Sequence, residues 1–159
     1  MRPMSPETDA VATLSSRIES AMRDAMRAGD GRRTQTLRMA MASAHNLKIA
    51  RRRELTDDEV IDVLTTQVKQ RRESIALFRD AGREESAAAE EAEAVILAEF
   101  LPAQLSESEI ETLAREAISA TGASSATDLG RVMGQLTQRT KGRADGRTVA
   151  ETVRRLLAS

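Results

Sequence analysis

The chain has 159 residues, a net charge of −1, two Phe, and no Tyr, Trp or Cys. The missing cysteines exclude a disulfide framework, a thiol nucleophile and a thiolate metal site. With almost no aromatic side chains, the interior must be filled by Leu, Ile, Val, Met and Ala, which favours an all-α fold.

Two helices are expected at the start of the chain from the helical spacing of apolar residues. The first is predicted from about Asp9 to Ala28 and ends at Gly29, a residue suited to helix termination. The second is predicted over about 32–53. Its apolar face is formed by Leu37, Met41, Ala44 and Leu47.

A third and a fourth helix follow. Thr56-Asp57-Asp58-Glu59 has the pattern of a capping box and begins a helix that ends at Gly82. The fourth helix, from about Glu84 to Phe100, is rich in Ala and Glu. Leu101-Pro102 ends it, because proline disfavours the α conformation in the residue before it. We place a domain boundary there, between a bundle over 1–101 and a smaller domain over 102–159.

Three short helices are expected in the second domain. Ser106 to Glu109 has the capping-box pattern and precedes a regular apolar stripe. A second helix begins near Thr127 or Asp128, and the last follows Asp145. The residues expected to face inward are Ile110, Leu113, Ala114, Ala117, Ile118, Leu129, Val132, Met133, Leu136, Val149, Val153, Leu156 and Leu157.

Charge is distributed unevenly along the chain. Residues 84–116 carry ten Glu and one Arg, a net charge of −9, whereas residues 131–159 carry a net charge of +5. This asymmetry is compatible with a surface for a charged partner. Pairing of the acidic helix with the basic ones inside the protein explains it equally well.

The first candidate binding element is the segment Lys141-Gly142-Arg143-Ala144-Asp145-Gly146-Arg147. Three cations and two glycines precede a helix N-terminus, which favours anions such as phosphate. A purely structural interpretation carries about equal weight. Gly142 suits a left-handed position after a helix, and Asp145 suits the N-cap of the next one.

A second candidate is Gly130-Arg131-Val132-Met133-Gly134. Glycines four residues apart lie on one helix face and allow another backbone to approach closely. Because glycine inside a helix costs roughly 1 kcal/mol relative to alanine, a compensating contact is expected. Packing within the domain is the favoured explanation, and a docking groove for a partner is the second.

Two basic clusters form a third candidate: Arg51, Arg52 and Arg53, and the run from Lys69 to Arg72. Lys and Arg contacts to phosphate dominate nucleic-acid affinity. The absence of aromatic platforms argues against base stacking, so an RNA contact would read shape and backbone. A solvated helix face with cations near its C-terminus is the favoured alternative.

Catalytic patterns are missing. His45 is the single histidine, and it is expected to be a packing or surface residue. No phosphate loop or nucleophile motif occurs. We therefore expect no catalytic residue, no cofactor and no metal. The lack of an apolar run near 20 residues and of an N-terminal signal core predicts a cytoplasmic protein with no membrane contact.

Several motifs together resemble the YqeY-like proteins of the GatB/YqeY family, from about residue 13 onward. They are Leu37-Arg38, residues 52–57, residues 69–74, residues 78–83, residues 101–106, residues 122–125, residues 130–134 and residues 141–146.

The resemblance implies an N-terminal helical bundle and a small helical domain similar to the tail of the GatB subunit of tRNA-dependent amidotransferase. That tail contacts tRNA in the parent enzyme. Its motif corresponds here to Gly130, Gly134, Lys141, Gly142, Ala144 and Gly146. The family is also associated with carbon–nitrogen ligase activity that uses glutamine as amido donor. The kinase body of GatB and the Ser/Lys machinery of the amidase subunit have no counterpart in this chain.

Three functions follow as hypotheses. The leading one is a non-catalytic binding module that contacts tRNA or a translation protein through its cationic C-terminal domain. The second is an accessory component of a glutamine-dependent tRNA amidotransferase, active only with catalytic subunits. The third is a protein-interaction bundle that binds no RNA.

Overall fold

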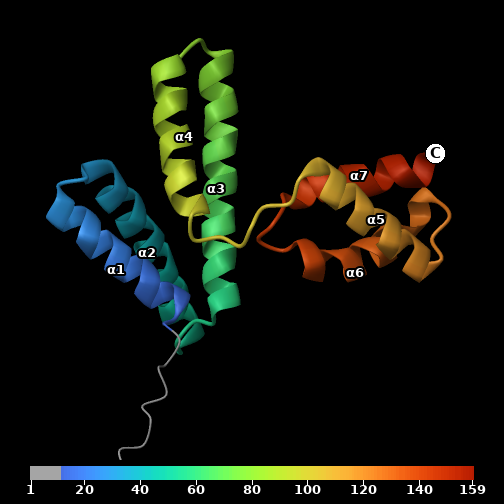
Figure 1. Cartoon of the computed structure of the whole chain (residues 1–159), viewed down its shortest axis with the longest axis horizontal. Coiled ribbons are helices and arrows are strands. Elements are labelled where there is room, and N and C mark those ends of the chain that lie inside the picture. Colours follow the sequence, from blue (N-terminus) through green and yellow to red (C-terminus); the bar gives the residue numbers. More distant parts are fainter. Residues whose placement is uncertain (1–11) are drawn as a thin grey trace, which may run out of the picture. The chain divides into compact units, whose positions relative to one another are not determined.

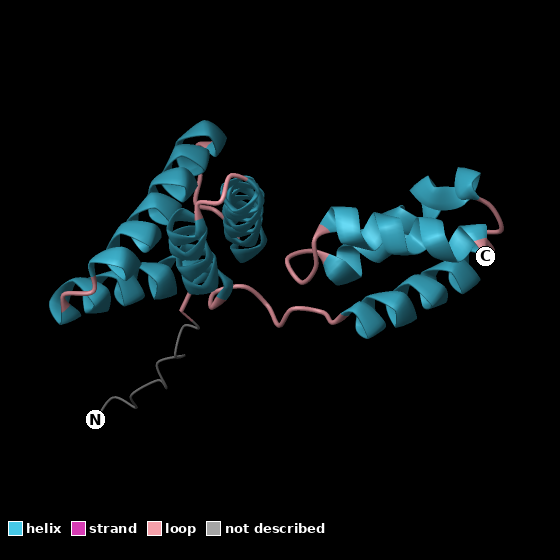
Figure 2. Cartoon of the chain, turned by 90° about the horizontal axis from the view of Figure 1, so that it is seen from above, coloured by secondary structure: helices cyan, strands magenta, loops and turns pink. Residues whose placement is uncertain are grey.

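The computed structural model describes residues 12–159, which form seven α-helices and one 3-10 helix. No strand occurs in this part of the chain, as Figure 2 shows. The predicted all-α fold is confirmed. The chain divides into two compact units, Met1–Phe100 and Leu101–Ser159.

The first unit consists of two helical hairpins (Figure 1). One hairpin pairs α1 with α2 and the other pairs α3 with α4, while α2 also packs against α3 and α4. The helices are α1 (Leu14–Ala28), α2 (Gly31–Arg51), α3 (Asp57–Asp80) and α4 (Glu84–Ala98).

Side-chain caps define where α1, α2 and α3 begin. The Thr56 hydroxyl accepts a hydrogen bond from the Glu59 amide at 3.2 Å, and the Glu59 carboxylate accepts one from the Thr56 amide at 3.1 Å. The predicted capping box is therefore confirmed. Helix α1 begins at Leu14, where the Thr13 side chain caps it. The expected start near Asp9 lies outside the described residues.

Two predicted helix ends extend too far. Helix α2 ends at Arg51 and not at Arg53, because Arg52 adopts a left-handed conformation with φ of 55°. Helix α4 ends at Ala98 and not at Phe100. Terminal turns depend on contacts beyond the local apolar pattern, so ends are the least predictable part of a helix.

A chain of polar side chains crosses the first unit. The Gln67 amide on α3 donates to the Ser43 hydroxyl on α2 at 2.7 Å. One turn along α3, Arg71 donates to the Gln67 carbonyl at 3.3 Å and to the Glu93 carboxylate of α4 at 3.1 Å. Arg71 is only 7% exposed. The run from Lys69 to Arg72 is thus not a uniformly solvated basic face, because one of its cations pairs inside the bundle.

The second unit contains α5 (Glu107–Thr121), the 3-10 helix η1 (Ala126–Asp128), α6 (Leu129–Thr140) and α7 (Gly146–Ala158). Its core is formed by the predicted inward stripes, which confirms that pattern. The buried residues are Ile110, Ala114, Ala117, Val132, Leu136, Val149 and Val153, and the other predicted inward residues pack against them partly buried.

Among residues 12–159, none of the helices combines the length and apolar character needed to cross a bilayer.

Breaking the Arg71–Glu93 pair should destabilise the first unit. Glu93→Gln leaves the buried Arg71 guanidinium without its counter-charge, so we expect the free energy of unfolding in urea to fall by about 3 kcal/mol. The double variant Arg71→Met, Glu93→Leu removes both charges and should recover most of the loss. A single variant as stable as the parent chain would contradict this role.

Candidate functional site

The segment between α6 and α7 forms a tight turn in the second unit. Gly142 is buried and has φ of 72°, a left-handed conformation that favours glycine. The amides of Arg143 and Ala144 donate to the Thr140 carbonyl at 2.9 and 3.0 Å. Asp145 caps α7 by accepting a hydrogen bond from the Arg147 amide at 3.1 Å. These contacts account for Gly142 and Asp145 by helix termination and capping.

The same turn is bonded to the first residues of the second unit. Gln104 donates from its amide nitrogen to the Gly142 carbonyl at 2.9 Å, and the Leu105 amide donates to the Arg143 carbonyl at 2.8 Å. The Arg143 guanidinium donates to the Ala103 carbonyl at 3.2 Å. We call this set of three hydrogen bonds the clasp. The sequence predicts that Arg143 contacts a ligand. In the structure, Arg143 instead takes part in these intramolecular bonds.

The other two cations of the segment are exposed residues. Lys141 is exposed at the end of α6, and Arg147 is exposed in the first turn of α7. Gly146 is also exposed, and a Cβ built there would meet no atom within 4 Å. The surface of this segment therefore consists of two cationic side chains beside an open backbone.

Gly130 and Gly134 do not pack within the domain, so the favoured explanation for them is wrong. Both are exposed, and a Cβ at either position would meet nothing within 4 Å. The reason is helical geometry: residues two apart lie roughly 200° apart around a helix. Since Val132 and Leu136 face the core, the two glycines must face away from it. They form an open strip of backbone on α6.

Ion pairs within the second unit neutralise part of its positive charge. Arg139 pairs with Glu116 at 2.8 Å, and Arg155 pairs with Glu111 at 3.3 Å. Acidic α5 is thus joined to basic α6 and α7, which is the intramolecular explanation for the charge asymmetry.

Arg131, another predicted contact, is also engaged. It pairs with Asp128 at 2.8 Å. Backbone N–H donation from Ser124, followed by the bond to Arg131 and a second N–H from Ser125, lowers the pKa of Asp128 below its usual range. The Arg131 side chain thus pairs with the residue before α6 and also donates to the Thr121 carbonyl at 3.3 Å.

Arg154 is a cation that the sequence reasoning missed. It lies seven residues after Arg147 on α7, so both side chains project from nearly the same face, about 10 Å apart along the axis. Both residues are exposed, and neither side chain has a hydrogen bond or ion pair within the described part of the chain. Helical spacing alone would have identified this pair.

The arginines at the end of α2 converge on one carboxylate in the first unit. Glu59 pairs with Arg51 at 3.3 Å and with Arg53 at 2.7 Å. The hydrogen bond from Arg53, followed by that from the Thr56 amide, lowers the pKa of Glu59 to about 2. Arg52 is exposed in its left-handed position. This cluster is therefore partly neutralised by its own capping residue.

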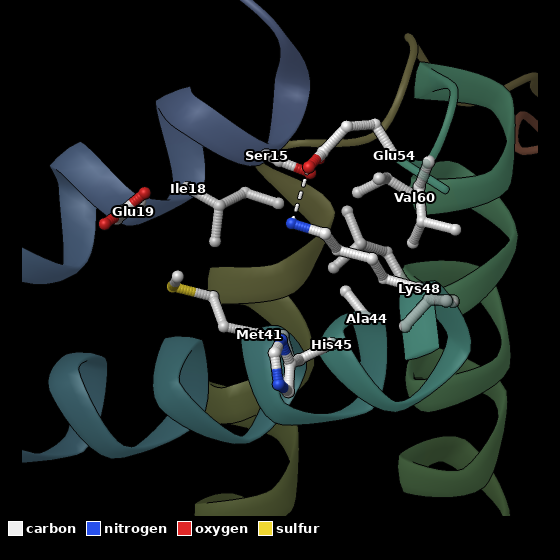
Figure 3. A pocket seen from close by; sticks show the side chains of 13 residues that line it. Ser15, Ile18, Glu19, Met41, Ala44, His45, Lys48, Glu54 and Val60 are labelled. Atoms are coloured by element: carbon white, nitrogen blue, oxygen red, sulfur yellow. Dashed lines mark ion pairs between the residues drawn. The ribbon is translucent and has the colours of Figure 1, made fainter. Parts of the chain in front are cut away.

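A cavity of about 250 Å³ lies between α1, α2 and α3 (Figure 3). Its walls are apolar and its rim carries Ser15, Glu19, His45, Lys48 and Glu54. His45 is exposed at this rim, so it is a surface residue and not a core one. The sequence pattern contains no signal for the cavity.

No group of three His, Asp or Glu side chains in residues 12–159 is placed to hold a metal ion. The predicted contacts at 130–134 and 141–147 belong to the second unit, and those at Arg51 to Arg53 belong to the first.

The sequence model of the family described as Yqey-like protein matches residues 15–157. No curated protein matches the chain.

Removing the Gln104 side chain should loosen the clasp. Gln104→Ala loses the bond to the Gly142 carbonyl, so we expect the second unit to lose about 1 kcal/mol of stability. Amide hydrogen exchange at Leu105, whose N–H donates to Arg143, should speed up. Gln138→Ala is the matched control, because the Gln138 side chain makes no hydrogen bond within residues 12–159. Equal exchange in both variants would show that the clasp is not stabilising.

The lowered pKa of Glu59 predicts a pH dependence of stability. A depressed carboxyl pKa stabilises the fold above the unfolded pKa, near 4.5, and this contribution is lost as pH falls toward about 2. Arg53→Met should raise the pKa of Glu59, measured by carboxyl ¹³C NMR, and Glu59→Gln should flatten the acid limb of the stability curve. An unchanged titration midpoint of Glu59 in Arg53→Met would refute the conclusion that Arg53 lowers the pKa of Glu59.

Proposed function

The chain belongs to the YqeY-like family, and on that premise we propose that it is a non-catalytic helical binding module that docks on tRNA through its cationic C-terminal domain. The proposal rests on the surface of the second unit and on the resemblance of its motifs to the tail of the GatB subunit. In this proposal the chain binds and carries out no reaction of its own.

The observation that carries the proposal is the pair of exposed, unpartnered guanidinium groups of Arg147 and Arg154 on α7. Arginine presents a planar set of donors that matches phosphate oxygens. Cations already paired with carboxylates bind phosphate more weakly, because a phosphate must first displace the carboxylate. Arg147 and Arg154 are therefore better phosphate ligands than Arg131, Arg139 or Arg155.

Two further features of the second unit are also exposed. Exposed Lys141 lies at the other end of the turn that begins α7. The strip formed by Gly130 and Gly134 on α6 lets a backbone approach without side-chain obstruction. Together they suit a contact with the sugar–phosphate backbone. Base stacking is not part of the proposal, because the chain has no Tyr or Trp and only two Phe.

The double variant Arg147→Ala, Arg154→Ala should weaken tRNA binding in a filter-binding titration. With two fewer phosphate contacts, the slope of log K against log salt should become shallower by about 1.5. Arg23→Ala, Arg27→Ala is the matched control, since it removes the same charge from α1, where both arginines pair with carboxylates. The control should bind tRNA as the parent chain does.

Equal weakening in both double variants would mean that only net charge matters. A chain without tRNA affinity at low salt would refute the proposal. Co-purification with an amidase- or GatB-like subunit in that case would support the accessory role in a glutamine-dependent amidotransferase. Docking on an unrelated protein partner would support an interaction bundle.

A further inference from the structure

The cavity in the first unit has the lining of a small-ligand site. Four of its wall residues, Ile18, Ala40, Val60 and Leu64, are only 1–3% exposed. The apolar surface open to a ligand therefore comes from the half-buried residues Met41, Ala44, Leu55 and Val63. Ala40 and Ala44 supply only methyl groups from α2, which leaves the space between α1 and α3 unfilled. Concave apolar sites with a few polar groups at the rim are typical of small-molecule binding.

An ion pair lies at the mouth of this cavity. The Lys48 ammonium contacts the Glu54 carboxylate at 2.6 Å, and Figure 3 shows the pair beside Ile18 and Val60. Lys48 projects from α2, whereas Glu54 belongs to the loop that follows α2 and its side chain is 83% exposed. The carboxylate can therefore leave for solvent at little cost, while the Lys48 side chain, only 44% exposed, stays at the cavity.

The other charged residues at the rim do not change the sign of the net charge at the cavity mouth. Glu19 is held by Arg23 of the same helix. His45 and Ser15 supply neutral or positive hydrogen-bond donors. Once Glu54 turns away, the charge left over the apolar walls is the Lys48 ammonium.

We propose that this cavity binds a small aliphatic carboxylate, with its hydrocarbon chain against Met41, Ala44 and Val63 and its head group on Lys48 in place of Glu54. Glu54 shows in this structure that a carboxylate fits on Lys48 at this position. With a volume of about 250 Å³, the cavity has room for a short hydrocarbon chain. The site is independent of the cationic surface on the second unit.

The test is a titration of the full chain with sodium octanoate, followed by methyl NMR of Met41, Ala44, Leu55 and Val63. Saturable shifts should be confined to these methyl groups. Lys48→Met keeps the apolar stem and should weaken binding about tenfold, as loss of a charge-assisted hydrogen bond implies. Glu54→Gln removes the competing carboxylate and should strengthen binding about threefold.

Two controls make the result specific. Lys69→Met removes a cation from the exposed face of α3, outside the cavity, and should bind octanoate unchanged. Octylamine, which has the same chain and the opposite charge, should bind at least tenfold more weakly. The proposal is overturned by shifts that do not saturate or that spread over both units. It is also overturned by equal binding in Lys48→Met and Lys69→Met, or by octylamine binding as tightly as octanoate.

Discussion

The size of the available side chains constrains every packed contact in this protein, because two Phe are its entire aromatic complement. Alanine takes a large part in both cores, as at Ala87 and Ala114, which are fully buried. Short side chains allow helices to pack closely, but they leave space where three helices meet, as at the cavity between α1, α2 and α3. Polar residues fill part of the interior instead. Arg71 crosses from α3 to Glu93 on α4, and a buried pair of this kind is satisfied in only one alignment of the two helices.

Single carboxylates in this protein have two electrostatic roles. A carboxylate that caps a helix also neutralises nearby arginines: Glu59 caps α3 and holds Arg51 and Arg53, and Asp128 holds Arg131 at the start of α6. The number of cations in the sequence therefore overstates the positive surface offered to a partner. In the second unit, the exposed cations whose side chains make no hydrogen bond or ion pair within residues 12–159 are Arg147 and Arg154 of α7.

Local sequence signals were sufficient to predict most of the helices. Caps at Thr56, Ser106 and Asp145 and the apolar stripes act within four residues, so the helices they define are confirmed. For Gly130 the sequence favoured packing within the domain, and this was wrong, because Gly130 is exposed on α6. The burial of Arg71 could not be predicted, because its partner lies 22 residues away on another helix. The cavity and the clasp likewise depend on contacts between segments distant in sequence.

The clasp has a consequence for how the chain can be divided. The first residues of the second unit bond to a turn about 40 positions later, through Gln104 to Gly142 and Arg143 to Ala103. A cut or a gene fusion placed before Leu101 leaves every one of these bonds within the C-terminal fragment. The fragment therefore keeps the three hydrogen bonds of the clasp next to the end at which another protein would be joined. We therefore expect such a fragment to retain the clasp when it is joined to an unrelated chain.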